Sequence, residues 1–360
     1  MQKYNIAICG AFDIVSYGDS LFPIAFDYEM RKRLEEYNMF FLFSPIGCDQ
    51  SYGTGGKVYS YKEFEICNDQ YHFDLIVIGG GELLHFRPIT FHDQNGKQVI
   101  YEVGQLWQIP IDFAKKKNIP YIINAVGAPY SFGLEEGRCI RKYLESAAYI
   151  SVRDIYSQKR LTAVGVESEL VPDSLWNMPR YVKNVPVIEK DYIVIQYGTL
   201  FQIEKLFDVI RKLKNKYGKE IVILPINYCH DDRIIVERAK EYLGNDIITY
   251  DSQLPIEEIY NLIAKSNMFI GTSLHGTITA LSNCVPALIL DMYPFLVGKM
   301  DGLHIWLNGE LKMVSDMQSI EYMVQCILNE KKEKRQIEID KLQKKTDEHF
   351  DKIADIIKMQ

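Results

Sequence analysis

The sequence predicts an α/β protein with two doubly wound, Rossmann-like parallel-sheet domains that face a cleft. Three observations support this. Short apolar runs alternate with longer amphipathic stretches along most of the chain, which is typical of parallel sheets covered by helices. The alternation stops at a polar, proline-containing segment at 177–190 and then resumes. A chain of 360 residues also exceeds the usual size of one hydrophobic core.

We assign residues 1–176 to the first domain. Its short apolar runs predict strands at Tyr4–Cys9, Phe40–Phe43, Leu75–Ile78, Tyr121–Asn124, Tyr149–Val152 and Leu170–Val171. Apolar residues at helical spacing predict helices at Leu21–Tyr37, Leu106–Lys117, Leu134–Ala147 and Ile155–Val164. Because strand and helix alternate, consecutive strands should lie parallel, with helices on both faces of the sheet.

Residues 177–190 are expected to form a linker, because the segment is polar and contains Pro179 and Pro186. The second domain should span 191–319. Its expected strands are Tyr192–Gln196, Ile221–Leu224, Ile247–Tyr250, Met268–Ile270 and Ala287–Leu290. Its expected helices are Phe201–Tyr217, Asp231–Leu243, Ile256–Ala264 and Thr277–Ser282.

The last segment, 320–360, is rich in Lys and Glu and has apolar residues at loose helical spacing. We expect a helical tail that packs back on the first domain. A solvated helix and a partner-binding helix remain alternatives.

The composition and the net charge of the chain argue against some classes of function. A formal net charge of −7 argues against a nucleic-acid binder, which needs an excess of Lys and Arg against phosphate. The seven cysteines are scattered without a C-x-x-C pair, so we expect reduced thiols and no metal site. We find neither a signal-peptide pattern nor a membrane-spanning apolar run. The expectation is a cytoplasmic protein with at most peripheral contact with the inner face of the cell membrane.

In parallel sheets, ligands bind in the loops that follow the carboxyl ends of strands. The first such loop here is Gly79-Gly80-Gly81-Glu82. Three glycines let the backbone approach a ligand and leave N–H groups to face it. The alternative is a tight turn with a conformational role alone.

Two further strand ends carry charged residues. Arg153 follows the strand Tyr149–Val152, and Asp154 stands where it would cap the next helix. Arg153 would place a cation beside a ligand, or it would pair with Asp154 or Asp173 to hold loops together. Asp173 would orient a basic residue in the cleft or cap a short helix.

The loop Gly271-Thr272-Ser273-Leu274-His275-Gly276 gives the sharpest signal. Thr272 or Ser273 would cap the following helix. Leu274, Ile278 and Leu281 fall on one helix face and should be buried, whereas His275 is rotated by about 100° from Leu274 and need not be. A helix N-terminus favours an anion, so His275 would stand beside one.

Taken together, these stretches resemble the polysaccharide pyruvyl transferase family over roughly Ile6 to Trp306. The resemblance lies in the order and spacing of several short motifs. They are Gly18-Asp19, the Gly79–Glu82 loop, Ser151–Asp154 with Val171-Pro172-Asp173, Leu274-His275-Gly276 followed by Ala280 and Val285-Pro286-Ala287, and Lys299 ahead of Gly302-Leu303.

The resemblance implies a fold similar to the two-domain GT-B glycosyltransferases, phosphoenolpyruvate as donor, no cofactor and a sugar acceptor. The acceptor would belong to a surface polysaccharide or its lipid-linked oligosaccharide precursor. Many members carry Arg immediately before the Leu-His pair, where this chain has Ser273. Another cation, Arg153 or Lys299, would then hold the donor, or the substrate differs.

On this basis we assign catalysis to His275, as general base or acid. Donor binding is assigned to Arg153, Lys299, Thr272, Ser273 and Gly276. Acceptor candidates are Asp19, Gly80, Gly81, Glu82 and Asp173. The polar stretch Arg87–Gln105 would form an acceptor lid, with Tyr101 and Trp107 either stacking on a sugar or packing in the core.

Two other functions fit the same sequence. A GT-B glycosyltransferase would use a nucleotide sugar and usually needs an acidic residue in the second domain, for which Asp251, Glu257 and Glu258 are available. A non-catalytic member of a polysaccharide-assembly complex is the other alternative, and Ser273 is the feature that favours it.

Overall fold

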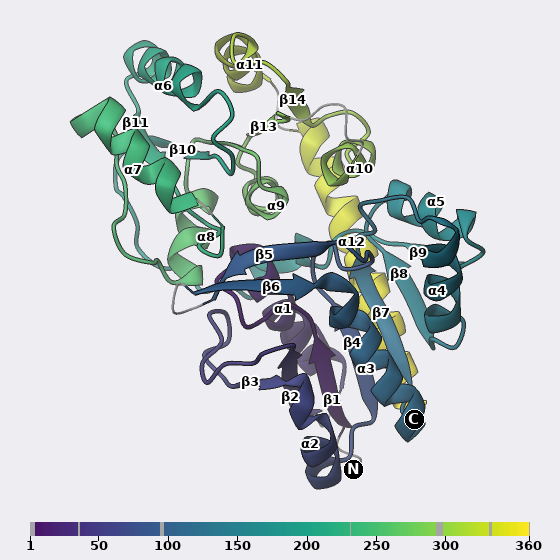
Figure 1. Cartoon of the computed structure of the whole chain (residues 1–360). Coiled ribbons are helices and arrows are strands. Elements are labelled where there is room, and N and C mark those ends of the chain that lie inside the picture. The colour runs from purple at the N-terminus through teal and green to yellow at the C-terminus, as the bar shows by residue number, and fades with distance from the viewer. Residues whose placement is uncertain are drawn as a thin grey trace. The chain divides into compact units, whose positions relative to one another are not determined.

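Two separate parallel sheets organise the chain (Figure 1). The computed structural model describes residues 4–34, 37–93, 97–230, 232–292, 298–330 and 333–359. The chain divides into two units, one of Met1–Ser174 with Leu342–Gln360 and the other of Leu175–Lys341. Each unit is built around its own sheet.

The first unit contains a seven-stranded sheet in the order β3-β2-β1-β4-β7-β8-β9, with every neighbouring pair parallel. The strands are β1 (Tyr4–Cys9), β2 (Tyr37–Ser44), β3 (Val58–Ser60), β4 (Leu75–Gly79), β7 (Tyr121–Val126), β8 (Tyr149–Val152) and β9 (Glu169–Leu170). The helices are α1 (Tyr17–Arg33), η1 (Tyr61–Glu63), α2 (Phe64–Tyr71), α3 (Val103–Lys117), α4 (Leu134–Leu144) and α5 (Ile155–Ala163).

The central strands of this sheet are buried on both faces. All residues of β4 and β7 are buried, and their sequences Leu-Ile-Val-Ile-Gly and Tyr-Ile-Ile-Asn-Ala-Val are almost wholly apolar. Continuous runs of branched apolar residues are typical of strands covered by helices on both sides. Their carboxyl ends therefore lie side by side at one edge of the sheet, with Gly79 paired to Asn124.

The stretch Arg87–Gln105 forms an antiparallel hairpin of β5 (Pro88–His92) and β6 (Gln98–Glu102), which the sequence analysis did not predict as strands. The Tyr101 hydroxyl donates a hydrogen bond to Oδ1 of Asp13, and the Trp107 indole N–H donates to the His85 carbonyl. Both rings are buried. Of the two roles considered for them, core packing is the one observed.

The second unit contains a five-stranded parallel sheet in the order β11-β10-β12-β13-β14. The strands are β10 (Tyr192–Gln196), β11 (Glu220–Ile223), β12 (Met268–Gly271), β13 (Ala287–Leu290) and β14 (Lys312–Val314). The helical segments are η2 (Ser174–Arg180), α6 (Ile203–Tyr217), α7 (Asp232–Leu243), η3 (Gly244–Asp246), α8 (Ile256–Ala264), α9 (Leu274–Ser282), α10 (Lys299–Trp306) and α11 (Ser319–Leu328).

The expected strand Ile247–Tyr250 is wrong. Only Ile248 forms a bridge, to Val222 of β11, and the four residues are partly exposed. The segment follows the turn η3 and leads into the polar residues 251–253, so it gains neither the burial nor the continuous pairing of a full strand.

Residues 177–190, expected to be a linker, lie within the second unit. Trp176 and Met178 in η2 are fully buried. The Asn261 side-chain amide donates a hydrogen bond to the Lys183 carbonyl at 2.8 Å. Met178, beside Pro179, is therefore buried within the second unit, and the boundary between the units falls earlier, at Ser174.

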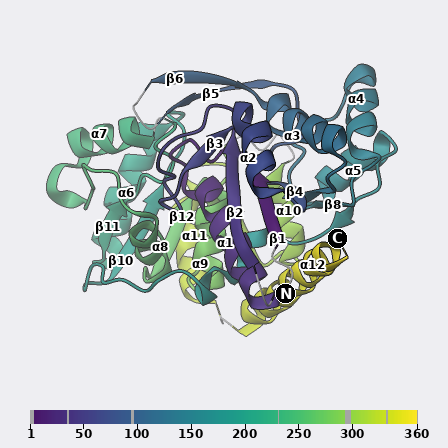
Figure 2. The ribbon, with the colours of Figure 1, turned by 90° about the horizontal axis from the view of Figure 1, so that it is seen from below.

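The tail forms two helices, which belong to different units. Ile320, Val324 and Ile327 of α11 contribute to the core of the second unit. The following helix, α12 (Glu333–Lys358), enters the first unit from Leu342 onward. Figures 1 and 2 show that α12 ends on the side of the first unit where β1 begins.

Polar and aromatic contacts fix α12 to the first unit. The Arg33 guanidinium of α1 donates hydrogen bonds to the Asp351 carboxylate at 2.6 Å and to the Asp347 carbonyl at 3.0 Å. The ring of Phe350 packs edge-on against Phe26 at 6.3 Å. None of the described helices is both long enough and apolar enough to cross a membrane.

Candidate functional site

The turn from β12 into α9 places His275 in the first turn of a helix. The helix begins at Leu274, three residues before the predicted start, and Ser273 is its N-cap, with Oγ accepting a hydrogen bond from Gly276 N at 3.2 Å. Leu274, Ile278 and Leu281 are buried as predicted, whereas His275 is partly exposed. Helix geometry thus separates the imidazole from the core-facing side chains.

Glycine is required at Gly276 because the helix packs on an aromatic ring. A Cβ atom there would lie 2.5 Å from Cζ of Phe269, which is closer than real contacts allow. Gly276 N already donates to Ser273, so this residue contributes through its lack of a side chain. The first turn of α9 can therefore lie close to β12.

A buried hydrogen-bond network lies behind Thr272. Oε1 of Gln196 accepts from Thr272 N and from Thr272 Oγ1, both at 3.2 Å, and Gln196 Nε2 donates to Asp232 Oδ2 at 3.4 Å. The same Asp232 oxygen accepts from Ile226 N and Asn227 N, both at 3.1 Å. The network fixes the loop that carries the Ser273 cap.

Sequence reasoning missed Gln196 and Asp232. Each is a polar residue at the end of an apolar strand or the start of a helix, and both are buried. A single polar residue at such a position does not reveal its partner. Only the pairing of β10 with β12, which sets Gln196 opposite Gly271, brings the members together.

Lys299 is the first residue of α10 and is partly exposed. It belongs to the same unit as His275. Asp301 caps the start of α10, because its carboxylate accepts a hydrogen bond from Gly298 N at 2.8 Å.

The acceptor candidates gather at the carboxyl edge of the first sheet. A Cβ atom on Gly81 would lie 3.1 Å from Asp19 Oδ1, and one on Gly127 would lie 3.0 Å from Cγ of Glu82. Gly80 has a φ of +126°, a conformation that favours glycine. The structure therefore brings Asp19, Gly81 and Glu82 together around glycines that permit the close approach.

Arg153 joins this cluster from β8. Its Nε atom would lie 3.4 Å from a Cβ atom on Gly127, and its Nη1 donates to Asp173 Oδ2 at 3.2 Å. Both members of the pair are buried, so each charge is compensated by the other. The loop-holding pair that the sequence left as an alternative is present, and Asp154 caps α5 by accepting from Ser157 N at 2.8 Å, as predicted.

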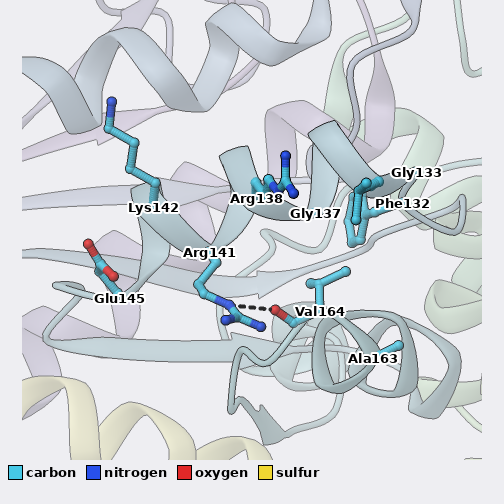
Figure 3. A pocket seen from close by; sticks show the side chains of 10 residues that line it. Phe132, Gly133, Gly137, Arg138, Arg141, Lys142, Glu145, Ala163 and Val164 are labelled. Atoms are coloured by element: carbon cyan, nitrogen blue, oxygen red, sulfur yellow. Dashed lines mark hydrogen bonds between the residues drawn. The ribbon is translucent and has the colours of Figure 1, made fainter.

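A cavity of about 620 Å³ lies along α4 and the end of α5, away from all of these residues (Figure 3). The Arg141 Nε atom donates to the Val164 carbonyl at 2.9 Å. Figure 3 shows the side chains of Arg138 and Lys142 extending the opposite way from that of Arg141. Because these cations diverge, the cavity does not form a converging anion site.

Comparison with solved structures identifies the fold. The chain is similar to S. aureus MnaA in a co-structure with UDP, with a TM-score of 0.63, 13% identity, and 94% of this chain and 91% of that chain covered. It is also similar to UDP-GlcNAc 2-epimerase from Neisseria meningitidis bound to UDP-GlcNAc, with a TM-score of 0.60, 13% identity, and coverage of 99% and 98%.

The UDP-N-acetylglucosamine 2-epimerase from Rickettsia bellii gives a TM-score of 0.61 at 13% identity, with 100% of this chain and 96% of that chain covered. At such identities the likeness shows the fold alone. It confirms the predicted class, two parallel-sheet α/β domains of the GT-B-like type.

The sequence itself was compared with protein families and with curated proteins. The profile of the family described as polysaccharide pyruvyl transferase matches residues 9–292. No curated protein matches the chain. The matched range includes the Gly79–Glu82 loop, Arg153, Asp173 and His275.

Proposed function

The chain belongs to the polysaccharide pyruvyl transferase family, and on that premise we propose that it transfers the pyruvyl group of phosphoenolpyruvate. The acceptor is a sugar of a surface polysaccharide or of its lipid-linked precursor, and the product is a pyruvate ketal. Family membership makes the protein a transferase. The donor, the acceptor and the roles of individual residues are the proposal.

The position of His275 is the observation that carries the proposal. The imidazole stands in the first turn of α9, partly exposed, while the residues before and after it on the helix face the core. The N-terminus of a helix supplies N–H groups and a positive partial charge, which favour an anionic substrate beside the ring. His275 is therefore assigned as the group that transfers a proton.

The donor residues are proposed around the same helix. Ser273 and Thr272 supply hydroxyls at the end of β12, Gly276 allows close packing, and Lys299 supplies an ammonium group. Arg153, which belongs to the first unit, remains a proposed donor cation on the sequence pattern alone. Its bond to Asp173 fixes the guanidinium, so any contribution to the donor comes from a preoriented group.

The acceptor residues are proposed at the carboxyl edge of the first sheet. Asp19 and Glu82 are partly exposed carboxylates, which accept hydrogen bonds from sugar hydroxyls. Gly80 and Gly81 keep the edge open to a ring-sized ligand. Asp173, buried against Arg153, would act by holding that guanidinium.

The chemistry requires three proton transfers. Protonation of C3 of phosphoenolpyruvate converts the methylene carbon to a methyl group and makes C2 electrophilic. One sugar hydroxyl adds to C2 and loses its proton to a base. A second hydroxyl displaces phosphate from C2, and its proton leaves with the phosphate. One molecule of phosphoenolpyruvate and one diol thus give one ketal and one inorganic phosphate.

The test is phosphate release from phosphoenolpyruvate in the presence of methyl glycosides that carry a free 4,6-diol, with the product identified by mass. Replacing His275 with Ala should lower the rate by roughly a hundred- to ten-thousandfold, the usual contribution of a positioned proton-transfer group. The matched control is His230→Ala, because His230 is an exposed histidine in the same unit.

A His275→Ala variant that keeps the wild-type rate would remove His275 from the mechanism. Release of UDP from a UDP-sugar without any phosphoenolpyruvate-dependent phosphate would instead favour the glycosyltransferase alternative. Absence of both activities with intact binding of phosphoenolpyruvate would favour a non-catalytic role.

A further inference from the structure

A small pocket lies between the loop that follows β4 and the loop that follows β7. The residues that line it begin at His85, shortly after the Gly79–Glu82 loop. Its polar lining consists of His85, Arg87, Tyr130, Ser131 and Glu136. The two loops are tied together, because Gly127 N donates to the Gly81 carbonyl at 3.0 Å and Leu84 N donates to the Gly127 carbonyl at 3.1 Å. The pocket volume is about 20 Å³, enough for one water-sized group.

His85 forms part of the wall of this pocket. Its Nδ1 accepts a hydrogen bond from Arg87 N at 3.1 Å, so the proton of the neutral ring sits on Nε2. The residue is 4% exposed, and its ring also forms a hydrogen bond with the backbone of Glu82. Burial lowers the pKa of His85, which keeps the ring neutral near pH 7.

Arg87 presents a preoriented cation beside it. The guanidinium carbon lies 3.7 Å from the centroid of the Tyr130 ring, and the His85 ring meets the same tyrosine edge-on at 5.4 Å. Stacking holds the planar group while leaving the N–H bonds at its edge available. In the part of the chain that the structure describes, no carboxylate lies within ion-pair distance of Arg87.

Glu136 also lines this pocket, and its negative charge opposes the attraction of an anion by Arg87. Its carboxylate accepts a hydrogen bond from Gly133 N at 2.8 Å and so closes the start of α4. A fixed carboxylate repels a bare anion but accepts hydrogen bonds from a hydroxyl. The combination therefore suits a ligand in which an anionic oxygen and a hydroxyl are neighbours.

From this arrangement we propose that Arg87, His85 and Tyr130 form a binding site for a single oxyanion oxygen of a phosphate or carboxylate group. Arg87 supplies the charge, Tyr130 orients the guanidinium by stacking, and His85 fixes the Arg87 backbone by accepting a hydrogen bond from its amide. The site stands on its own geometry, so it does not depend on the proposed transfer reaction. Two sources carry such an oxygen, namely a glycosyl phosphate, which also has a neighbouring hydroxyl, and phosphoenolpyruvate, which has none.

The test is binding measured by isothermal calorimetry on the full chain, with glucose 1-phosphate, phosphoenolpyruvate and inorganic phosphate as separate probes. Arg87→Ala should weaken binding of at least one probe by roughly tenfold or more, as expected for loss of a charge-assisted hydrogen bond. Tyr130→Leu should also weaken binding of that probe, because the Arg87 guanidinium loses the aromatic ring on which it stacks. Tyr130→Phe keeps the ring and should bind within about twofold of wild type.

Arg138→Ala is the control for net charge, since Arg138 is an exposed arginine of the same unit outside this pocket. It should leave affinity unchanged. Stronger binding of glucose 1-phosphate than of phosphoenolpyruvate would identify the source as a sugar phosphate, and the reverse order would identify the donor.

The proposal is overturned if none of the three probes binds wild type, if Arg87→Ala binds as wild type does, or if Arg138→Ala loses as much affinity as Arg87→Ala. Because these measurements need no turnover, they stay separate from the test of the proposed function. Loss of phosphate release with retained binding would count against the reaction and leave this site in place.

Discussion

The Nε2 atom of His349 on α12 lies 2.7 Å from the Oδ1 atom of Asn124 on β7. The other ring nitrogen, Nδ1, lies 3.1 Å from the Tyr149 hydroxyl on β8. Because an amide oxygen accepts, Nε2 carries the ring proton and Nδ1 accepts from the tyrosine. A buried, neutral histidine thus joins the C-terminal helix to two strands of the first sheet.

This histidine should make stability depend on pH. Burial, with smaller contributions from Lys352 and Arg33, lowers the pKa of His349 to about 3. The unfolded chain binds this proton at a pKa of about 6.5. The stabilisation is therefore complete above pH 6.5 and is lost progressively as pH falls toward 3. Between pH 7 and 5.5 the free energy of unfolding should fall by about 1 kcal/mol through this residue.

The measurement is urea unfolding at several pH values, with His349→Gln as the matched variant. Glutamine keeps polar atoms near Asn124 but does not titrate. At pH 7 the variant should have a lower free energy of unfolding than wild type. Between pH 7 and 5.5 this free energy should change less than it does for wild type. Parallel pH curves for the two proteins would show that His349 does not titrate on unfolding as stated.

Substitutions at Ser273 should separate the helix cap from ligand binding. Ser273→Ala removes the acceptor for Gly276 N and should lower the free energy of unfolding by roughly 1 kcal/mol. Ser273→Asn and Ser273→Asp both keep a cap and should remain near wild-type stability. The Asp variant should nevertheless bind phosphoenolpyruvate more weakly than the Asn variant, because it adds a negative charge at the proposed anion site.

Chemical unfolding and calorimetry on the three variants check this. Equal phosphoenolpyruvate affinity for the Asn and Asp variants would place the anion away from the first turn of α9.

Gln196 and Thr272 should show coupled effects on stability. Gln196→Leu removes the amide that bonds both Thr272 Oγ1 and Asp232 Oδ2, and should cost roughly 1–3 kcal/mol. Thr272→Val removes one bond to the same amide. In a double-mutant cycle the combined loss should fall short of the sum of the single losses by about 1 kcal/mol, as expected for residues in one network. Additive losses would contradict the network.

Tyr101→Phe should destabilise the first unit. It removes the hydroxyl that binds Asp13, whose pKa is raised by burial, and leaves a buried carboxylate oxygen without that donor. The expected cost is roughly 1–3 kcal/mol in urea unfolding. Tyr242→Phe is the matched control, since Tyr242 also donates to an aspartate, Asp208, but is 37% exposed. A loss for Tyr101→Phe no larger than for Tyr242→Phe would mean that burial adds nothing to the pair.

The sequence predicts the central strands well because their signal is local. β1, β8, β10 and β13 have the predicted bounds, and each is a short apolar run. The strands that were missed, β3, β14 and the β5–β6 hairpin, are short and partly exposed. Their formation depends on a neighbouring strand, which a single segment of sequence does not reveal.

The candidate site was likewise predicted only in part. The glycine loop and the His275 turn follow predicted strands, so their place at the carboxyl edge of a sheet could be anticipated. The partners of these residues could not. Gln196 reaches Thr272 across 76 positions of sequence, and the Arg87 guanidinium stacks on Tyr130, which follows a different strand. Such pairings arise from tertiary packing and leave no pattern in the local sequence.

The course of α12 has a consequence for how the protein is made. Leu342, Phe350, Ile353 and Ile357 complete the core of the first unit, although they are translated after the whole of Leu175–Lys341. During translation, residues 4–174 therefore cannot complete their core until the second unit and α12 have been synthesised. Part of their apolar surface stays exposed to solvent until then. Nascent chains stalled before Leu342 should be held by chaperones or degraded, whereas those extended past Lys358 should resist protease.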